Sequence, residues 1–181
     1  MNNNAPVIWL TGMSASGKTT IAYRLKNSIE QQGFKVSIID GDTLRGSDDE
    51  KLGFGFDDVR INNKRIAALC NEHREEFDVV IVPVISPYEE IRNEVRNTLE
   101  PNFHLIYLKT DIDSLKDRDP KGLYAAADHG KINNLIGYSD INPYDEPHNP
   151  ELVVSTANGI SPDESFATIY NYINRTIFID K

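Results

Sequence analysis

Residues 12–19, with the sequence GMSASGKT, constrain the chain more than any other feature. They fit the phosphate-binding pattern G-x-x-x-x-G-K-[ST]. The apolar run Val7–Leu10 precedes them, and a helical pattern follows, with an apolar face that includes Ile21, Leu25 and Ile29. In a strand–loop–helix arrangement, the loop N–H groups and the helix N-terminus favour anions. The sequence therefore predicts a phosphate site; the alternative is a glycine-rich turn that binds nothing.

The chemistry of this motif needs two particular side chains. Lys18 can reach the β- and γ-phosphates of a nucleotide, and the Thr19 hydroxyl can ligate Mg²⁺. We therefore expect ATP and Mg²⁺ at this loop.

The composition indicates one folded domain over residues 1–181. Charged residues make up 26% and hydrophobic residues 39%, which excludes disordered and membrane-spanning classes. No secretory signal is visible in the first residues, MNNNAP. Cys70 is the only cysteine, which fits a reducing cytoplasm, and we interpret it as a small core residue.

The net charge of −9 argues against nucleic acid as a partner, because such proteins usually carry a basic face. No membrane partner is expected either. The basic residues near candidate sites are Lys18, Arg45, Arg60, Lys64, Arg65, Arg118 and Lys121.

Apolar segments alternate with helical patterns along the chain. Expected strands are Val7–Leu10, Val36–Asp40, Val79–Ile85, His104–Leu108 and Leu152–Val154. Expected helices are Thr19–Gln32, Asp58–His73, Tyr88–Leu99, Asp111–Arg118 and Pro162–Asn174, the last with a capping box from Ser161 to Glu164. This alternation predicts an α/β fold whose parallel sheet is covered on both faces and binds ligands at the strands' carboxyl ends.

The stretch Asp119–Pro150 interrupts this pattern. It has few apolar residues and no sustained period. Long loops in compact domains are usually functional or disordered. We interpret residues 119–150 as a mobile lid over the phosphate site; the alternative is a solvated excursion without a role.

Two acidic residues follow the second expected strand. Asp40 can hold Mg²⁺ through water or accept a proton from an attacking hydroxyl. Asp42 could serve the same site, or it could simply cap the next helix.

Several further residues suit a nucleotide acceptor. Arg60 and Asn63 are three apart on one helical face, where they could bind an anion with hydrogen-bonding edges or belong to a solvated face. Phe54 and Phe56 could stack on a base or pin their loop to the core. Ser86 could contact the acceptor or cap the next helix.

Taken in order, these segments resemble the adenylyl-sulfate kinase (APS kinase) family. The matching pieces, between about Val7 and Thr156, are GMSASGKTT, DGDTLR, LGF at 52–54, Arg60 with Asn63, ISPY at 85–88 and RDPKGLY at 118–124. The resemblance implies a three-layer P-loop NTPase fold of the nucleotide-kinase type, with a five-stranded parallel sheet. It also implies transfer of the γ-phosphoryl group of ATP to the 3′-hydroxyl of adenylyl sulfate, giving 3′-phosphoadenylyl sulfate for sulfate assimilation, and a homodimer.

The resemblance also implies roles for individual residues. It assigns ATP to Gly12, Ser14, Ser16, Gly17, Lys18, Thr19, Thr20, Arg118 and Thr156, and Mg²⁺ to Thr19 and Asp40. It assigns the acceptor to Asp42, Arg45, Phe54, Arg60, Asn63, Ile85, Ser86, Lys121 and Leu135. Lys18, Asp40 and Ser86 lie closest to the chemistry; a phosphate carried by the serine matching Ser86 in some relatives is treated as incidental.

The sequence departs from the family on the acceptor side. Leu135-Ile136-Gly137 stands where the family has Phe-Thr-Gly. The stretch between Gly137 and Pro143 is two residues longer than in the family. One extra residue between Phe54 and Arg60 leaves open whether Phe54 or Phe56 stacks on the base. A lost base–aromatic contact is worth about 1–3 kcal/mol. The alternatives are a kinase for another nucleotide, such as cytidine diphosphoramidate, and an inactive nucleotide-binding regulatory module.

Overall fold

A parallel sheet forms the centre of the protein. The structure, a computed structural model, describes residues 5–41, 44 and 52–178. Neighbouring strands pair in parallel in the order β2-β3-β1-β4-β5, which confirms the predicted five-stranded sheet. The strands are β1 (Val7–Thr11), β2 (Val36–Ile38), β3 (Val79–Pro83), β4 (Phe103–Lys109) and β5 (Leu152–Ser155).

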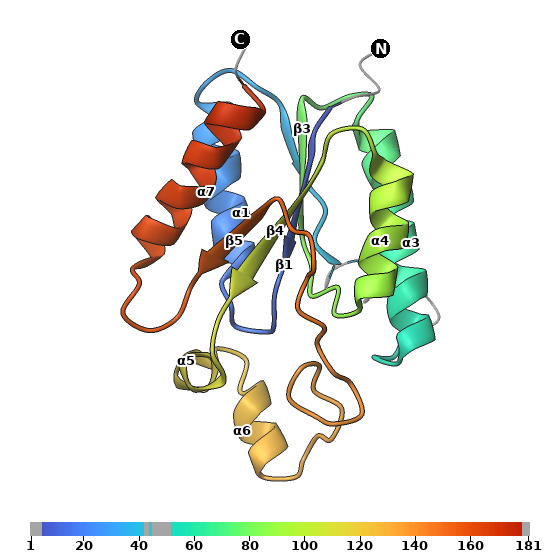
Figure 1. The fold of residues 1–181 in the computed structure, drawn as a ribbon, viewed down its shortest axis with the longest axis vertical. Helices are drawn as coiled ribbons and strands as arrows, with labels where there is room; N and C mark the ends of the chain where they lie inside the picture. The colour runs from blue at the N-terminus through green and yellow to red at the C-terminus, as the bar shows by residue number, and fades with distance from the viewer. Residues whose placement is uncertain (1–4, 42–43, 45–51, 179–181) are drawn as a thin grey trace.

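Helices cover both faces of the sheet, so the three-layer α/β architecture is also confirmed. Helices α1 and α7 lie on one face, and α3 and α4 lie on the other (Figure 1). The helices are α1 (Lys18–Glu30), α3 (Phe56–His73), α4 (Glu89–Leu99), α5 (Ile112–Arg118), α6 (Leu123–Asp128) and α7 (Pro162–Thr176).

The central strand β1 contributes to two cores, because side chains alternate along a strand. Ile8 and Leu10 pack in the cluster that includes α1 and α7. Val7 and Trp9 pack in the cluster that includes α3 and α4. Cys70 belongs to this second cluster, and burial raises the pKa of its thiol to about 12, as expected for an inert core residue.

The structure tests two of the three helix caps considered from the sequence; the third, Asp42, lies outside the described residues. The capping box of α7 is confirmed: Ser161 Oγ accepts from the Glu164 N–H at 3.1 Å, and the Glu164 carboxylate accepts from the Ser161 N–H at 2.8 Å. The interpretation of Ser86 as a cap is wrong. Tyr88 is the N-cap of α4 and makes no side-chain cap bond, and Ser86 lies two residues before it.

Residues 119–150 lie beyond the carboxyl ends of the strands, beside α5 (Figure 1). This segment is more ordered than its composition suggests, because it contains α6 and a small core of Tyr124 and Leu135 against Leu115. The carboxylate of Asp119 accepts from two N–H groups in α6 and so stabilises its start. Helix α6 was missed because its six residues are too few to show a period.

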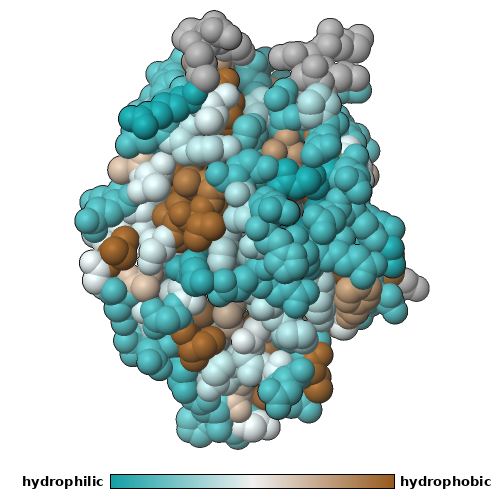
Figure 2. Space-filling model, viewed as in Figure 1, coloured by the Kyte–Doolittle hydropathy of each residue, from teal (hydrophilic) through white to brown (hydrophobic). Residues whose placement is uncertain are grey.

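The surface is mainly polar on the face drawn in Figure 2, where the hydrophobic patches are small and separate. Ile141 and Val153 are among the large apolar side chains that remain exposed. Within the described ranges, no helix is both long enough and apolar enough to cross a membrane.

Candidate functional site

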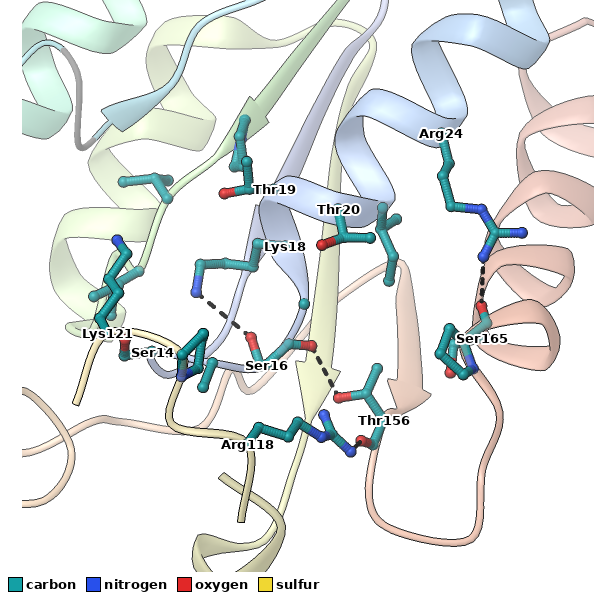
Figure 3. Close-up of a pocket in the computed structure, with 18 of the residues that line it drawn as sticks. Ser14, Ser16, Lys18, Thr19, Thr20, Arg24, Arg118, Lys121, Thr156 and Ser165 are labelled. Atoms are coloured by element: carbon teal, nitrogen blue, oxygen red, sulfur yellow. Dashed lines mark hydrogen bonds between the residues drawn. The ribbon is translucent and has the colours of Figure 1, made fainter. Parts of the chain in front are cut away.

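The phosphate-binding motif forms a tight loop between β1 and α1. A methyl group on Gly12 would lie 2.8 Å from the carbonyl oxygen of Leu108, so this position needs glycine. Lys18 folds back over the loop toward Ser16 (Figure 3). Its Nζ donates to the carbonyl oxygens of Gly12 and Met13 at 2.9 and 2.8 Å. Helix α1 begins after Gly17 with no side-chain cap, which suits its N-terminus to binding an anion.

A cavity of about 390 Å³ opens over this loop. Its size falls within the range of small-molecule sites, roughly 300–1,000 Å³. It brings together the loop, the first turns of α1, the end of β3 and residues of the expected lid. Its predicted site residues are Ser14, Ser16, Gly17, Lys18, Thr19, Thr20, Asp40, Ile85, Arg118, Lys121 and Thr156, and Arg24, Ile160, Pro162 and Ser165 also line it.

Arg118 and Thr156 form one wall of this larger cavity (Figure 3). The Arg118 guanidinium donates to the carbonyl oxygen of Thr156. The Thr156 hydroxyl donates to the carbonyl oxygen of Ser16 at 3.1 Å. The wall is thereby joined to the phosphate loop by hydrogen bonds that the chain makes with itself.

Two oxygen-bearing side chains of the larger cavity suit a hard cation. Thr19 is the second residue of α1, and Asp40 follows β2. A hydroxyl and a carboxylate are ligands that Mg²⁺ accepts, usually together with waters and substrate phosphates. Within the described part of the chain, no group of three or more His, Cys, Asp or Glu residues forms a site made by the protein alone.

A smaller cavity of about 20 Å³ adjoins the larger one, and Val84 and Ile85 line both. It lies between the end of β3, the start of α3 and the expected lid. Its other lining residues are Gly41, Phe54, Val59, Asn62, Asn63, Ser86, Pro87 and Ile136.

Three buried polar side chains line the smaller cavity. Asn62 Nδ2, Asn63 Oδ1 and Ser86 Oγ have no hydrogen-bond partner among the described residues. The side-chain nitrogen of Asn63 does have a partner, because Nδ2 donates to the carbonyl oxygen of Val59 at 2.9 Å. Unpaired buried polar atoms destabilise a fold and commonly mark a functional site.

Asn62 is a site residue that the sequence interpretation missed. It is buried on α3, in phase with Val59 three residues before it and Ile66 four residues after it. A polar residue within an apolar helical stripe was the signal that could have identified it.

Arg60 lies elsewhere than predicted. Its guanidinium makes two hydrogen bonds with the carboxylate of Glu94 on α4, and Arg60 lines neither of the two cavities in the described part of the chain. These bonds hold the pKa of Glu94 below its usual value. The cause is helical geometry: Arg60 and the inward Asn62 are two positions apart and so face different directions.

Phe54 and Phe56 occupy different environments. Phe54 lines the smaller cavity and is 44% exposed. The Phe56 ring packs against Tyr88, with the centroids 4.9 Å apart. Of the two alternatives for a stacking ring, the geometry favours Phe54.

Leu135 also lies elsewhere than predicted. It packs against Tyr124 of the expected lid and Leu115 of α5, and its neighbour Ile136 lines the smaller cavity in its place. The lid therefore contributes Ile136 to this cavity, one residue after the Leu135 that the resemblance implied. Two further acceptor residues of the prediction, Asp42 and Arg45, lie outside the described residues.

Comparisons with known proteins point to one family. A family model described as adenylylsulphate kinase matches residues 4–155. A protein named adenylyl-sulfate kinase from Bacillus pumilus is 39% identical over 173 residues, which cover 95% of this chain and 86% of the relative. A solved structure of the Mycobacterium tuberculosis APS kinase CysC in complex with AMPPNP and APS has a TM-score of 0.82 and 30% identity, covering 94% of this chain and 98% of that one.

Proposed function

Because the chain belongs to the adenylylsulphate kinase family, we propose that it transfers the γ-phosphoryl group of ATP to the 3′-hydroxyl of adenylyl sulfate. The products are ADP and 3′-phosphoadenylyl sulfate. Two nucleotides must meet at one point for this reaction, so the site needs two adjoining binding regions.

One observation carries the proposal: the two cavities share Val84 and Ile85 at the end of β3. Strand β3 pairs directly with β1, which leads into the phosphate loop. A donor held at the loop and an acceptor held in the smaller cavity would therefore face each other across neighbouring strand ends.

We assign the donor to the larger cavity. The loop amides and Lys18 hold the phosphates, and Arg118 and Thr156 line the region for the rest of the nucleotide. The remaining donor contacts are assigned to Gly12, Ser14, Ser16, Gly17, Thr19 and Thr20. Lys121 reaches this cavity from the lid, where its charge would favour the same anion.

The residues present fit a magnesium ion bound together with ATP. The Thr19 hydroxyl would ligate the ion, and the Asp40 carboxylate would hold it through water at the same cavity. When bound, Mg²⁺ would neutralise negative charge on the β- and γ-phosphates.

The transfer itself requires positioning and charge stabilisation. The acceptor 3′-oxygen forms a bond to the γ-phosphorus as the bond to the β,γ-bridging oxygen breaks, and the electron pair leaves with ADP. Asp40 accepts the hydroxyl proton, and Lys18 stabilises the charge on the transferring group.

We assign the acceptor to the smaller cavity. Phe54 stacks on the base, and Ile85 and Ser86 line the site. Asn62 replaces Asn63 as the residue that binds the acceptor, since its unpartnered Nδ2 can donate to it. The family pattern has an arginine three residues before this asparagine. If Asn62 is that asparagine, its distance in sequence from Phe54 matches the family without an extra residue. Val59 then stands at the position of the family's arginine.

A coupled assay of ADP release tests the proposal. The protein is incubated with Mg·ATP, with and without adenylyl sulfate. Release that depends on adenylyl sulfate supports the function. Folded protein that releases no ADP above the blank contradicts it.

A second acceptor is favoured by one observation. The described residues of the smaller cavity include no cation, and the lid contributes Ile136 instead of an aromatic ring. Such a cavity would grip an adenine and its anionic tail less strongly than the family pattern does. Turnover of adenylyl sulfate and of cytidine diphosphoramidate should be compared at equal concentration. A large preference for adenylyl sulfate would remove this candidate.

Two larger-scale features complete the proposal. Residues 119–150 act as a lid within a single domain of residues 1–181, and the chain forms a homodimer as its family resemblance implies. Light scattering of the purified protein measures the oligomer directly.

A further inference from the structure

Arg92 carries a fully buried charge outside the residues assigned above. It lies on α4 and is 1% exposed. A charge is almost never fully buried unless it is paired. Its guanidinium makes bonds to three separate parts of the chain, so its position is closely fixed.

The first bond reaches the acceptor side of the site. Arg92 donates to the carbonyl oxygen of Ser86 at 2.7 Å. Ser86 has a φ of 45°, in the left-handed region that serine rarely adopts. Its carbonyl must be held by its surroundings for this conformation to persist, and the buried Ser86 hydroxyl then lines the smaller cavity.

The second bond reaches the last part of the expected lid, which leads back to β5 and passes the foot of α4 (Figure 1). Arg92 donates to the carbonyl oxygen of Asp145 at 2.6 Å. Asp145 also donates its N–H to the carbonyl oxygen of Pro87 at 2.8 Å. The same guanidinium therefore holds both the end of β3 and the segment where the lid rejoins the sheet.

The remaining contacts orient Arg92. The carboxylate of Glu89 accepts from its Nε and one terminal nitrogen at 3.2 and 2.6 Å. The ring of Tyr144 lies 5.7 Å from the guanidinium carbon. A planar fork with several donors can make all these bonds at once, which a lysine ammonium in the same place cannot do.

We propose that Arg92 is a positioning residue for the acceptor half of the reaction. It touches neither nucleotide; it holds Ser86 in its left-handed conformation, so that the hydroxyl faces the smaller cavity, and joins this residue to the base of the lid. The expected change in the acceptor KM rests on the proposed function. The expected loss of order at Ser86 and at the base of the lid rests only on the contacts above.

The test is Arg92→Lys, which keeps the charge and removes the fork. The KM for the acceptor should rise about tenfold, as expected for the loss of one charge-assisted hydrogen bond, while the KM for ATP stays within about twofold. Arg74→Lys is the matched control, because Arg74 is also a buried arginine and donates to the carbonyl oxygens of Leu99 and Pro101, away from both cavities and from the lid. Equal changes in both KM values, or none, would contradict the proposal.

A double-mutant cycle distinguishes positioning from general loss of stability. In a Ser86→Ala background the hydroxyl is already gone, so Arg92→Lys should change the acceptor KM much less than it does alone. The full effect in that background would overturn the inference. Glu89→Gln is the milder variant if Arg92→Lys fails to fold, and it should change the acceptor KM in the same direction.

Limited proteolysis gives a readout that does not depend on turnover. Arg92→Lys should be cleaved faster within residues 139–150 than Arg74→Lys, at equal overall stability. Cleavage at the same rate would contradict the coupling of Arg92 to the lid. If the wild-type protein turns over no adenylyl sulfate, the proposed function fails, and proteolysis still decides this inference.

Discussion

The two sides of the site differ in how fully their polar groups are paired. On the donor side, Lys18, Arg118 and Thr156 already bond to the loop and to one another. On the acceptor side, Asn62 and Ser86 each keep a buried polar atom without a partner among the described residues. The chain therefore forms its donor region by itself, whereas its acceptor region requires an additional group.

The two cavities also differ in volume, and the acceptor cavity is again the less complete of the two. The donor cavity measures about 390 Å³ and the acceptor cavity about 20 Å³. The second volume is far below the roughly 300 Å³ of a small-molecule site. We therefore expect Ile136 of the lid and Phe54 to move apart when the acceptor binds.

The largest effect should come from Lys18→Ala on the donor side. The variant removes a cation from the transferring phosphoryl group, and kcat should fall by about 10²–10³-fold or more. ADP release in the coupled assay measures it, with Lys131→Ala on the lid as the matched lysine control, because Lys131 is exposed and lines neither cavity. If Lys18→Ala left turnover intact and changed only the binding of a partner protein, the chain would instead be a regulatory module.

Asn62→Ala should give the next largest effect, and this effect should be on binding of the acceptor and not of ATP. Loss of a hydrogen bond in a buried site is worth about 1–3 kcal/mol, so the acceptor KM should rise about 10- to 100-fold while the KM for ATP is preserved. Arg60→Ala is the control, because Arg60 pairs with Glu94 instead. A larger effect from Arg60→Ala than from Asn62→Ala would restore the interpretation made from the sequence.

Tyr124→Phe tests the donor side from the lid. The Tyr124 hydroxyl donates to the carbonyl oxygen of Ser14 at 2.9 Å, and thus joins α6 to the phosphate loop. Removing one such bond is worth about 0.5–1.5 kcal/mol, so the KM for ATP should rise about two- to tenfold with little change in the acceptor KM. Tyr138→Phe is the control within the lid, since Tyr138 bonds to Asp128. If Tyr124→Phe changed only the acceptor KM, the assignment of ATP to the larger cavity and of the acceptor to the smaller one would be contradicted.

The smallest effect concerns stability away from both sides. Burial lowers the pKa of His104 below its ordinary value of 6.5, with Glu151 raising it and Arg96 lowering it further. The folded state thus disfavours the proton, so its stabilising contribution is complete above pH 6.5 and is lost as the pH falls through the lowered pKa. Thermal unfolding between pH 7.5 and 5.5 should show a steeper decline for the wild type than for His104→Gln. Equal slopes would show that His104 does not cause the decline.

The fold could be predicted from the sequence because its signals are local. The phosphate loop is a contiguous motif, and the strands of the sheet are short apolar runs between helical patterns. Helix α6 was missed because six residues give no period, and its stability comes from Asp119 and from packing on Leu115.

The acceptor site was predicted less well because it depends on the phase of a helix. Each position turns a side chain by about 100° around a helix, so two positions separate Asn62, which lines the smaller cavity, from Arg60, which does not. A shift of one position separates Leu135 from Ile136 in the lid, where no regular element fixes the direction of the side chains. Such phases are decided by tertiary packing and cannot be read from spacing to a motif.

The contact between Gly137 and Met13 has a consequence for redesigning this protein. A methyl group at 137 would fall 2.6 Å from Met13 Cε, so these two positions share one volume. Gly137 also has a φ of 78°, which limits what may replace it. Substitution at 137 will thus be limited by its left-handed backbone more than by Met13, whose flexible side chain can shift, and libraries that vary position 13 alone should yield more folded members than libraries that vary position 137.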